Sequence, residues 1–360
     1  MTDAATGVGL ADARVDIPQQ ALTSTTDSAG RFTLTGVPDG RWVIRARAPG
    51  YATGLGTGGD IRLHALQAVA ACPAADAVVV PHITTTPSSL VPGSLVQLVV
   101  APDSATTVTG TLFGQPITFV RDATRGFVGL GAVPLDSTHA GVVSITYVYP
   151  SGAVAQTTAP LGLTSSVVIS AGPPRREALH VAPQFAARPV ASTAHRIAAE
   201  SELAHQVGTA SLGTQPLWHE PFERPRPGRV TSPFGGGRKF NGTLISRHTG
   251  TDFAGQIGDP VIAANRGVIA MIGDFFLAGT VVYIDHGAGL TSAYFHLSAV
   301  NVAVGDTVQR GQRIGSVGAT GRVTGPHLHW VVRYGTASVD PMGSLALQVP
   351  PTGPVVPLCK

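Results

Sequence analysis

Short runs of alternating apolar and polar residues recur along most of the chain. Residues 31–34 alternate in this way, and residues 42–46 do so again after a Pro-Asp-Gly turn. A period of two is typical of strands with one buried face, and glycine or proline marks the turns between them. We therefore expect strands here and at residues 13–17, which together predict a small β-sandwich over residues 1–66.

A second β region is predicted over residues 82–165. Its clearest alternation places Val143, Ile145, Tyr147 and Tyr149 on one face of a strand, and glycine or proline stands at each expected turn. Such a series of short strands with regular turns favours an immunoglobulin-like sandwich.

One helix is predicted in the connecting segment, residues 166–215. Residues 171–189 are rich in proline and arginine, as is typical of a linker, and residues 191–207 then carry apolar side chains along one side of a helix. The strand pattern resumes over residues 216–345 and is followed by a proline-rich tail, residues 346–360. The predicted fold class is mainly β and multi-domain, with two N-terminal β-sandwich modules and a single linker helix.

Composition supports this fold class and narrows the classes of function. The 360 residues include 44 Gly and 28 Pro, 12% are charged, and the mean hydropathy is +0.22, which suits strands and tight turns better than amphipathic helices. Two or three domains are expected, because a single core rarely serves more than about 300 residues. No run of about 18 apolar residues predicts an integral membrane segment.

Charge and cysteine content add further constraints. The net charge of +3 would help the protein approach an anionic polymer such as a cell wall. No basic cluster with interleaved aromatic residues is present, so we expect no nucleic-acid partner. Cys72 and Cys359 are too few for a metal cage, although one disulfide could join them. The polar start, Thr2-Asp3, is unlike a secretory leader.

Five of the 12 histidines lie between residues 248 and 329, and their spacing indicates a metal site. In the segment HTGTDF, His248 and Asp252 are four residues apart, so both side chains point to one face of an extended chain. In GPHLHW, His327 and His329 flank Leu328, and strand alternation places both rings on one face. Two imidazoles and a carboxylate could then meet at one ion.

A catalytic zinc ion usually takes three protein ligands and keeps one position open. His248, Asp252 and His329 would supply these ligands, which predicts one Zn²⁺ in the C-terminal domain and a site suited to hydrolysis. His296 and His327 would remain free to take a proton from water and to stabilise a developing oxyanion.

The order of these residues resembles the LytM and lysostaphin type of zinc peptidoglycan endopeptidases, also called the β-lytic metalloendopeptidase family. The similarity extends from about residue 218 to residue 342 and includes GRVTSPFGGGRKFNG, RHTGTDFAGQIGDPV, VVYIDHGAGLTSAYFHLS and GATGRVTGPHLHW. It implies an antiparallel β-sheet with a groove over the zinc ion. It also implies metal-ligand roles for His248, Asp252 and His329, and catalytic roles for His296 and His327.

The preceding regions carry resemblances of their own. The run TTDSAGRFTLTGVPDGRWVIRARAPGY resembles the carboxypeptidase regulatory-like domain, a transthyretin-like sandwich, and implies a scaffold or adhesion module over the first 66 residues. The stretch from Ile83 through the helix is similar to a β-domain and helical linker that precede the catalytic domain in one subgroup. We hypothesise that these segments cover the site in a resting form.

Two positions depart from the family pattern. Thr251 stands where relatives usually have an aliphatic residue, and Val331 stands where many carry an acidic residue. Because Val331 shares the strand face of His327 and His329, a carboxylate that could orient these histidines is missing. Their orientation is then expected to depend on other groups.

Parts of the sequence also fit two other kinds of protein. A non-catalytic peptidoglycan-binding or regulatory protein would be expected to lack metal ligands, and none is missing here. The run VAVGDTVQRGQRIGSVGATG also resembles a lipoyl or biotinyl carrier hairpin, but no lysine lies between Lys239 and Lys360 to bear the cofactor. His286 is expected to be a structural residue that bonds across a turn.

The predicted function is hydrolysis of peptide cross-links in bacterial peptidoglycan by a zinc metalloendopeptidase. Such a substrate implies a protein that is secreted, periplasmic or held at the cell envelope. The sequence does not distinguish glycine cross-bridges from D-amino-acid stem cross-links as the bond that is cut, and it leaves the oligomeric state open.

Overall fold

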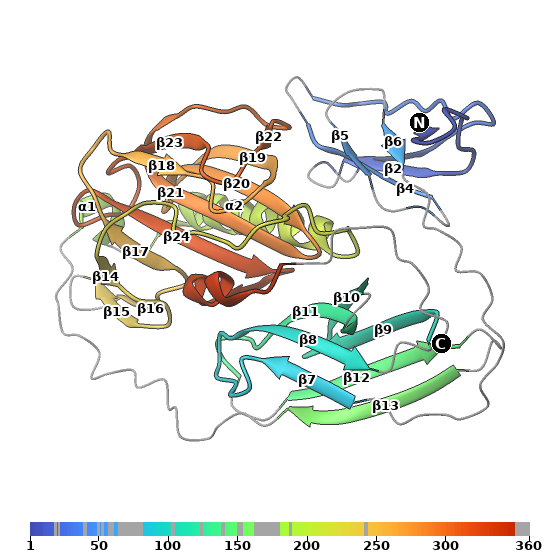
Figure 1. The fold of residues 1–360 in the computed structure, drawn as a ribbon. Helices are drawn as coiled ribbons and strands as arrows, with labels where there is room; N and C mark the ends of the chain where they lie inside the picture. Colours follow the sequence, from blue (N-terminus) through green and yellow to red (C-terminus); the bar gives the residue numbers. More distant parts are fainter. Residues whose placement is uncertain are drawn as a thin grey trace.

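The computed structural model of the chain is mostly β, with one long helix, and its sheets form three bodies that follow one another along the sequence (Figure 1). The expected mainly β, multi-domain fold is confirmed. The predictions for Cys72, Cys359, most of the linker residues 171–189 and most of the tail fall outside the described residues. The structure describes residues 1–17, 20, 22–38, 42–48, 51, 54–56, 61–63, 82–101, 105–122, 125–137, 141–149, 154–161, 181–186, 189–240 and 244–349.

The first body contains a four-stranded sheet in the order β3-β2-β4-β5 and a parallel pair, β1 with β6. Residues 31–34 form no strand, contrary to the prediction, and the backbone N–H and C=O of Arg31 bond to Asp27 within the turn instead of to a neighbouring strand. Phe32 and Leu34 still pack against the core around Val15 and Leu63. The strands are β1 Thr2–Asp3, β2 Arg14–Ile17, β3 Leu22–Thr25, β4 Ile44–Arg47, β5 Gly54–Gly56 and β6 Arg62–Leu63.

The second body is a seven-stranded antiparallel sheet in the order β13-β12-β9-β10-β11-β8-β7. Val143, Ile145 and Tyr147 of β12 are buried in its core, as their alternation predicts, and they pack in one cluster with Leu98 and Leu112. The strands are β7 His82–Thr86, β8 Leu95–Ala101, β9 Thr107–Leu112, β10 Gln115–Asp122, β11 Gly126–Ala132, β12 Gly141–Val148 and β13 Val154–Leu161.

The third body is built on a long sheet in the order β14-β17-β24-β21-β20-β19-β22, in which neighbouring strands are antiparallel. Strand β18 pairs with β23, which also joins β21, while β15 and β16 form a separate hairpin. The strands are β14 Val230–Ser232, β15 Gly237–Phe240, β16 Leu244–Arg247, β17 Thr251–Ala254, β18 Pro260–Ile262, β19 Gly267–Phe275, β20 Gly279–Gly287, β21 Leu290–Val300, β22 Thr307–Val308, β23 Arg313–Val317, β24 His327–Tyr334 and β25 Ala337–Val339. Among the described residues, this part of the chain also contains helix α1, Pro183–Ala186, and the 3₁₀ helix η2, Pro341–Ala346.

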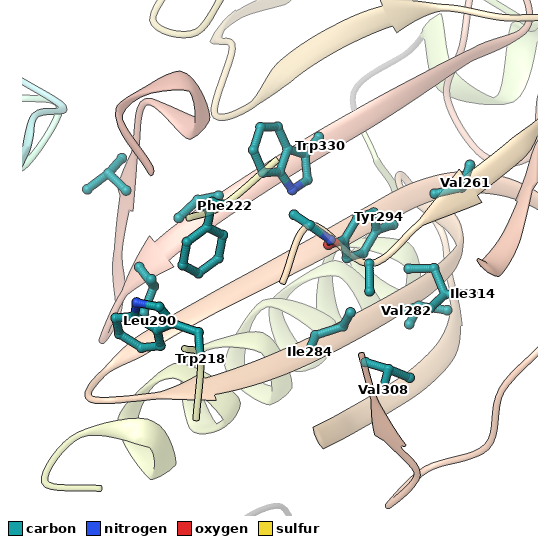
Figure 2. Close-up of a cluster of buried hydrophobic side chains, with 14 of the residues drawn as sticks. Trp218, Phe222, Val261, Val282, Ile284, Leu290, Tyr294, Val308, Ile314 and Trp330 are labelled. Carbon is teal, nitrogen blue, oxygen red and sulfur yellow. The ribbon is translucent and has the colours of Figure 1, made fainter. Parts of the chain in front are cut away.

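The two faces of the long sheet carry different residues. Leu328 and Trp330 of β24 are fully buried in the large apolar core of this body. Figure 2 shows Trp330 in this core, near Phe222 and Tyr294. His327, His329 and Val331 alternate with them and therefore point to the opposite face of the sheet. The core thus anchors one face of β24 and holds its histidines on the other.

Helix α2, Ala191–Ser211, lies along this opposite face (Figure 1). The predicted helix over residues 191–207 is confirmed, and it continues for four more residues. Ala204 and Val207 belong to the same buried cluster as Val331. An acidic side chain at position 331 would be buried against the helix at a large desolvation cost, which explains why an apolar residue stands there.

The second body and the third share a core. Leu95 and Leu130 lie in the same buried cluster as Trp218, and the Tyr334 hydroxyl donates a hydrogen bond to Pro116 O at 2.7 Å. Removing the second body would therefore expose apolar side chains of the third. The hypothesis that these segments cover the site in a resting form stays a prediction.

The first body contacts helix α2 through an arginine. Arg45 Nη1 donates a hydrogen bond to Ala210 O at 2.8 Å, near the helix C-terminus, and the same guanidinium pairs with Asp16 at 2.6 Å. A cation is favourable at a helix C-terminus because the carbonyl dipoles there point outwards. Among the described residues, no helix has both the length and the apolar character needed to cross a membrane.

His286 is a structural residue, as predicted. Its ring is fully buried; Nδ1 donates to Arg266 O at 2.8 Å, and Nε2 lies 2.8 Å from Ser292 Oγ. Burial lowers the pKa of His286 from 6.5 to about 4.

The low pKa of His286 predicts acid sensitivity. Between pH 6.5 and pH 4 the unfolded chain binds a proton at His286 that the folded chain does not, so stability falls as the pH falls through this window. The full shift corresponds to about 3 kcal/mol. Denaturant titrations across this range, in the presence of a chelator, should show a smaller loss of unfolding free energy for His286→Gln than for wild type. Equal pH dependence of the two proteins would contradict the prediction.

Candidate metal centre

Strand pairing brings together the two motifs that lie far apart in the sequence. Strand β17 runs antiparallel to β24, with Asp252 directly opposite His329. Residues that face each other across an antiparallel pair have side chains on the same face of the sheet. His248 lies three residues before β17, so its side chain reaches the same place.

Three side chains converge at this place. His248 Nε2 and His329 Nδ1 lie 3.1 and 2.7 Å from Asp252 Oδ1, and 2.9 Å from each other. All three residues are buried, and their potential ligand atoms lie within 4.8 Å of one another. Two imidazole nitrogens and one carboxylate oxygen form a donor set that suits a transition metal such as zinc. The group could therefore hold a metal ion.

Backbone and arginine contacts orient these side chains. His248 Nδ1 lies 2.7 Å from Pro233 O, so it donates its proton there and leaves the lone pair of Nε2 directed at the cluster. Arg238 pairs with Asp252 Oδ2 and also donates to Ser232 Oγ at 3.2 Å, which leaves Oδ1 for the cluster.

Burial and charge adjust the pKa values of the cluster. Burial would raise the pKa of the Asp252 carboxyl, but the close contacts with the imidazole rings of His248 and His329, which attract the carboxylate when they are protonated, outweigh burial and hold the pKa well below its usual range. Burial lowers the pKa of His329 to about 4, and the attraction of Asp252 only partly offsets it. At neutral pH the group therefore consists of a carboxylate and a neutral His329, the forms in which these residues bind metals.

His296 and His327 lie together beside the cluster. Their ring centroids are 4.8 Å apart, and His327 Nε2 is 3.7 Å from Asp252 Oδ1. His296 Nδ1 lies 2.8 Å from Thr320 O, and His327 Nδ1 lies 2.8 Å from Gly325 O. Each ring thus donates through Nδ1 to a backbone carbonyl and keeps Nε2 as a proton acceptor. These two carbonyl groups orient the rings of His296 and His327, as Pro233 O orients His248. They do what an acidic residue at position 331 was expected to do in relatives.

His296 has an unusual backbone conformation. Its φ of 63° lies in the left-handed region, which non-glycine residues seldom adopt, and its backbone N–H donates to Ala278 O at 2.9 Å. Burial, with the nearby charges of His327 and His329, lowers the pKa of His296 well below its ordinary value. The ring is therefore neutral at physiological pH.

All five predicted site residues lie in this one region, while Arg238, Gly250 and Thr320 were not singled out from the sequence. Arg238 lies within the quoted family motif, but only the hairpin geometry shows that it reaches Asp252. Thr320 acts through its carbonyl oxygen, for which side-chain chemistry gives no signal.

Gly250 is required by close packing against His329. A Cβ at this position would lie 2.5 Å from Trp330 O and 2.7 Å from His329 Cε1, closer than atoms can approach. We expect Gly250→Ala to displace the His329 ring and to weaken metal binding by about 10- to 100-fold, as misoriented ligands do. Metal titration with a competing chelator measures this. Gly237→Ala is the matched control, because a Cβ there meets no atom within 4 Å; equal affinities for the two variants would rule out the steric effect.

Comparison with known families assigns two parts of the chain. Residues 246–341 match "Peptidase family M23", and residues 1–69 match "Carboxypeptidase regulatory-like domain". The first match includes the five histidine and aspartate residues of the candidate site. The second covers the strands of the first body.

Named relatives and one solved structure agree with the first match. Peptidoglycan DD-endopeptidase ShyA of Vibrio cholerae is 50% identical over 86 residues, which cover 24% of this chain and 20% of that protein. DD-carboxypeptidase/endopeptidase Mpg of Neisseria meningitidis is 43% identical over 124 residues, 34% of this chain and 28% of that protein. The matched region thus covers 20% and 28% of the length of these two relatives. A peptidase M23 crystal structure from Pseudomonas aeruginosa matches 71% of this chain and 94% of its own, with 28% identity and a TM-score of 0.51.

Proposed function

We propose that this chain, whose residues 246–341 form a peptidase family M23 domain, is a zinc endopeptidase that cuts peptide cross-links of bacterial peptidoglycan at the cell envelope. The observation that carries the proposal is the convergence of His248, Asp252 and His329, with two further histidines beside them. Relatives named as peptidoglycan DD-endopeptidases supply the substrate class.

His248, Asp252 and His329 would hold the zinc ion, through Nε2, Oδ1 and Nδ1 respectively. When bound, zinc supplies Lewis-acid polarisation of the scissile carbonyl and acidifies water. Asp252 contributes a negative charge that offsets part of the charge of the ion, and Arg238 restricts it to one available oxygen. The buried setting of all three ligands keeps competing water away from this side of the site.

His296 and His327 would move protons at their Nε2 atoms. Both rings donate through Nδ1 to fixed carbonyl oxygens, so the tautomer with a free Nε2 lone pair is the stable one. His327 is the more exposed, with 15% of its side chain accessible, and is placed to take a proton from the attacking water and return it to the leaving amine. His296, buried beside it, is neutral at rest; the negative charge that develops on the oxyanion would favour uptake of a proton from solvent at Nε2, which would then donate a hydrogen bond to the oxyanion.

Digestion of purified peptidoglycan tests the proposal. The full chain should release peptide fragments with new amino termini, identified by mass, and a chelator should stop the reaction until Zn²⁺ is added back. Undiminished digestion by zinc-free protein would refute the metal role. Tight binding of peptidoglycan without any cleavage would favour the non-catalytic alternative instead.

A further inference from the structure

We propose that Glu200 of helix α2 is a positioning residue for His296, because it holds the turn that fixes both the backbone and the ring of that histidine. The inference rests on the proposed endopeptidase function and deepens it. Glu200 lies outside residues 246–341, the part that matches peptidase family M23. The helix before the M23 domain therefore becomes part of the machinery of hydrolysis.

Glu200 binds the turn between β19 and β20. Residues 276–278 form this turn and lie outside the strand ladder, so the backbone N–H of Phe276 needs an acceptor elsewhere. It donates to both carboxylate oxygens of Glu200, at 3.0 and 2.9 Å. The Glu200 side chain is only 13% exposed, so water competes little for this charge-assisted hydrogen bond.

Arg196, one helical turn before Glu200, strengthens the same attachment. Its Nε donates to Glu200 Oε1 at 2.6 Å, and its Nη2 donates to Asp274 O at 2.8 Å. The guanidinium also lies over the ring of Phe276, 5.9 Å from the ring centroid, and Phe185 of helix α1 contacts this ring with the two centroids 5.0 Å apart. Helices α1 and α2 together hold the end of the β19–β20 hairpin.

The turn fixes the backbone of His296. The carbonyl oxygen of Ala278, two residues after Phe276 in the same turn, accepts a hydrogen bond from His296 N at 2.9 Å. The φ of His296, 63°, is unfavourable for a non-glycine residue and persists only where surrounding contacts hold it. A turn released from Glu200 would hold this conformation less firmly.

The same turn supports the ring of His296 through Thr320. The backbone N–H of Thr280, just after the turn, donates to Thr320 Oγ1 at 3.0 Å, and Thr320 O accepts from His296 Nδ1 at 2.8 Å. A Cβ at Gly279 would lie 2.2 Å from Thr320 Oγ1, so the end of the hairpin and the Thr320 segment are in close contact. Both hydrogen bonds that orient His296 therefore depend on the β19–β20 turn.

The turn acts on His296 and not on the metal ligands. Pro233 O, Arg238 and the pairing of β17 with β24 orient the three ligands instead. His296 Nε2 must stand where negative charge develops on the substrate, and a misplacement of about 1 Å can cost about 100-fold in rate. Loss of the Glu200 contact should therefore slow the chemical step and leave zinc in place.

Two substitutions of Glu200 in the full chain test the inference, with a soluble cross-linked stem-peptide dimer from peptidoglycan as substrate. Glu200→Ala should lower kcat by about 10- to 100-fold with little change in KM or in zinc content. Glu200→Gln keeps one oxygen that can accept from Phe276 N and should restore most of kcat. Hydrogen–deuterium exchange at the amides of Phe276 and His296 should be faster in Glu200→Ala than in wild type.

Glu202→Ala is the matched control. Glu202 lies on the same helix, is exposed, and accepts from Gln206 Nε2 at 3.3 Å, so its loss should leave kcat, zinc content and amide exchange at wild-type values. Thermal unfolding of each variant gives the folded fraction to which kcat is referred. If Glu200→Ala keeps its kcat, loses activity through KM or zinc, or is no worse than Glu200→Gln, the positioning role is wrong. If wild type itself cleaves no dimer, the proposed function fails.

Discussion

His329→Ala is expected to abolish both metal binding and peptidoglycan digestion. The Nδ1 atom of His329 lies 2.7 Å from Asp252 Oδ1 and 2.9 Å from His248 Nε2, whereas His327 Nε2 is 3.7 Å from the same Asp252 oxygen. Zinc affinity should fall by about 10²- to 10³-fold, because one of three protein ligands is removed; structural zinc sites with four ligands contribute roughly 10 to 16 kcal/mol, or about 3 to 4 kcal/mol for each ligand. Metal content after dialysis and fragment release from peptidoglycan measure the two effects.

His219→Ala is the matched control for this substitution. His219 is exposed on the same body, so its loss should change neither zinc content nor digestion. A thermal unfolding profile for each variant shows whether the fold is kept. Stoichiometric zinc in His329→Ala would overturn the assignment of the ligands.

His327→Ala should separate the chemistry from metal binding. The ring lies 3.7 Å from Asp252 Oδ1 through Nε2, farther than the rings of His248 and His329, and its Nδ1 donates to Gly325 O. We therefore expect zinc content to stay at the wild-type level while kcat falls by about 10²- to 10⁴-fold, the contribution of a general acid or base.

Comparison of His327→Ala with His329→Ala tests whether His327 transfers protons or instead binds the metal ion. If His327→Ala loses its zinc as His329→Ala does, then His327 is a ligand and not a proton carrier. If it keeps both zinc and full kcat, then neither role applies. Peptide release under substrate saturation, with metal content measured on the same sample, distinguishes these outcomes.

Much of the candidate site could be predicted from local spacing. His327 and His329 flank Leu328, and His248 stands four residues before Asp252, so each pair was expected to share one face of an extended segment. The structure brings both pairs together. For His327 and His329 this follows from alternation along β24, whereas His248 lies between β16 and β17, outside any strand, so its contact with Asp252 does not follow from strand alternation.

The strand predicted at residues 31–34 is absent, because strand formation also requires backbone hydrogen bonds to a neighbouring strand. Residues 31–34 alternate as strands do, yet they form none, and the backbone N–H and C=O of Arg31 bond to Asp27 within the preceding turn. Alternation reports which side chains are buried, and Phe32 and Leu34 are indeed packed against the core. Alternation does not show whether the backbone N–H and C=O groups of a segment bond to a neighbouring strand or within a turn.

The absence of an acidic residue at position 331 was interpreted from the sequence as missing support for the histidines. In the structure Val331 is buried with Ala204 and Val207 of helix α2, and backbone carbonyl groups orient the rings instead. A carbonyl oxygen is present at every residue, so no side-chain pattern could indicate which of them would face a histidine.

The sequence by itself determined which residue types could form a metal centre, which of them share a strand face, and that the chain is mainly β. These features follow from side-chain chemistry and from the two-residue period of a strand. Only the tertiary structure decided that Asp252 stands opposite His329, that Arg238 reaches Asp252, and that a helix covers Val331. Such contacts join residues far apart in the chain, and they depend on strand register and on the packing of whole faces, which no local pattern encodes.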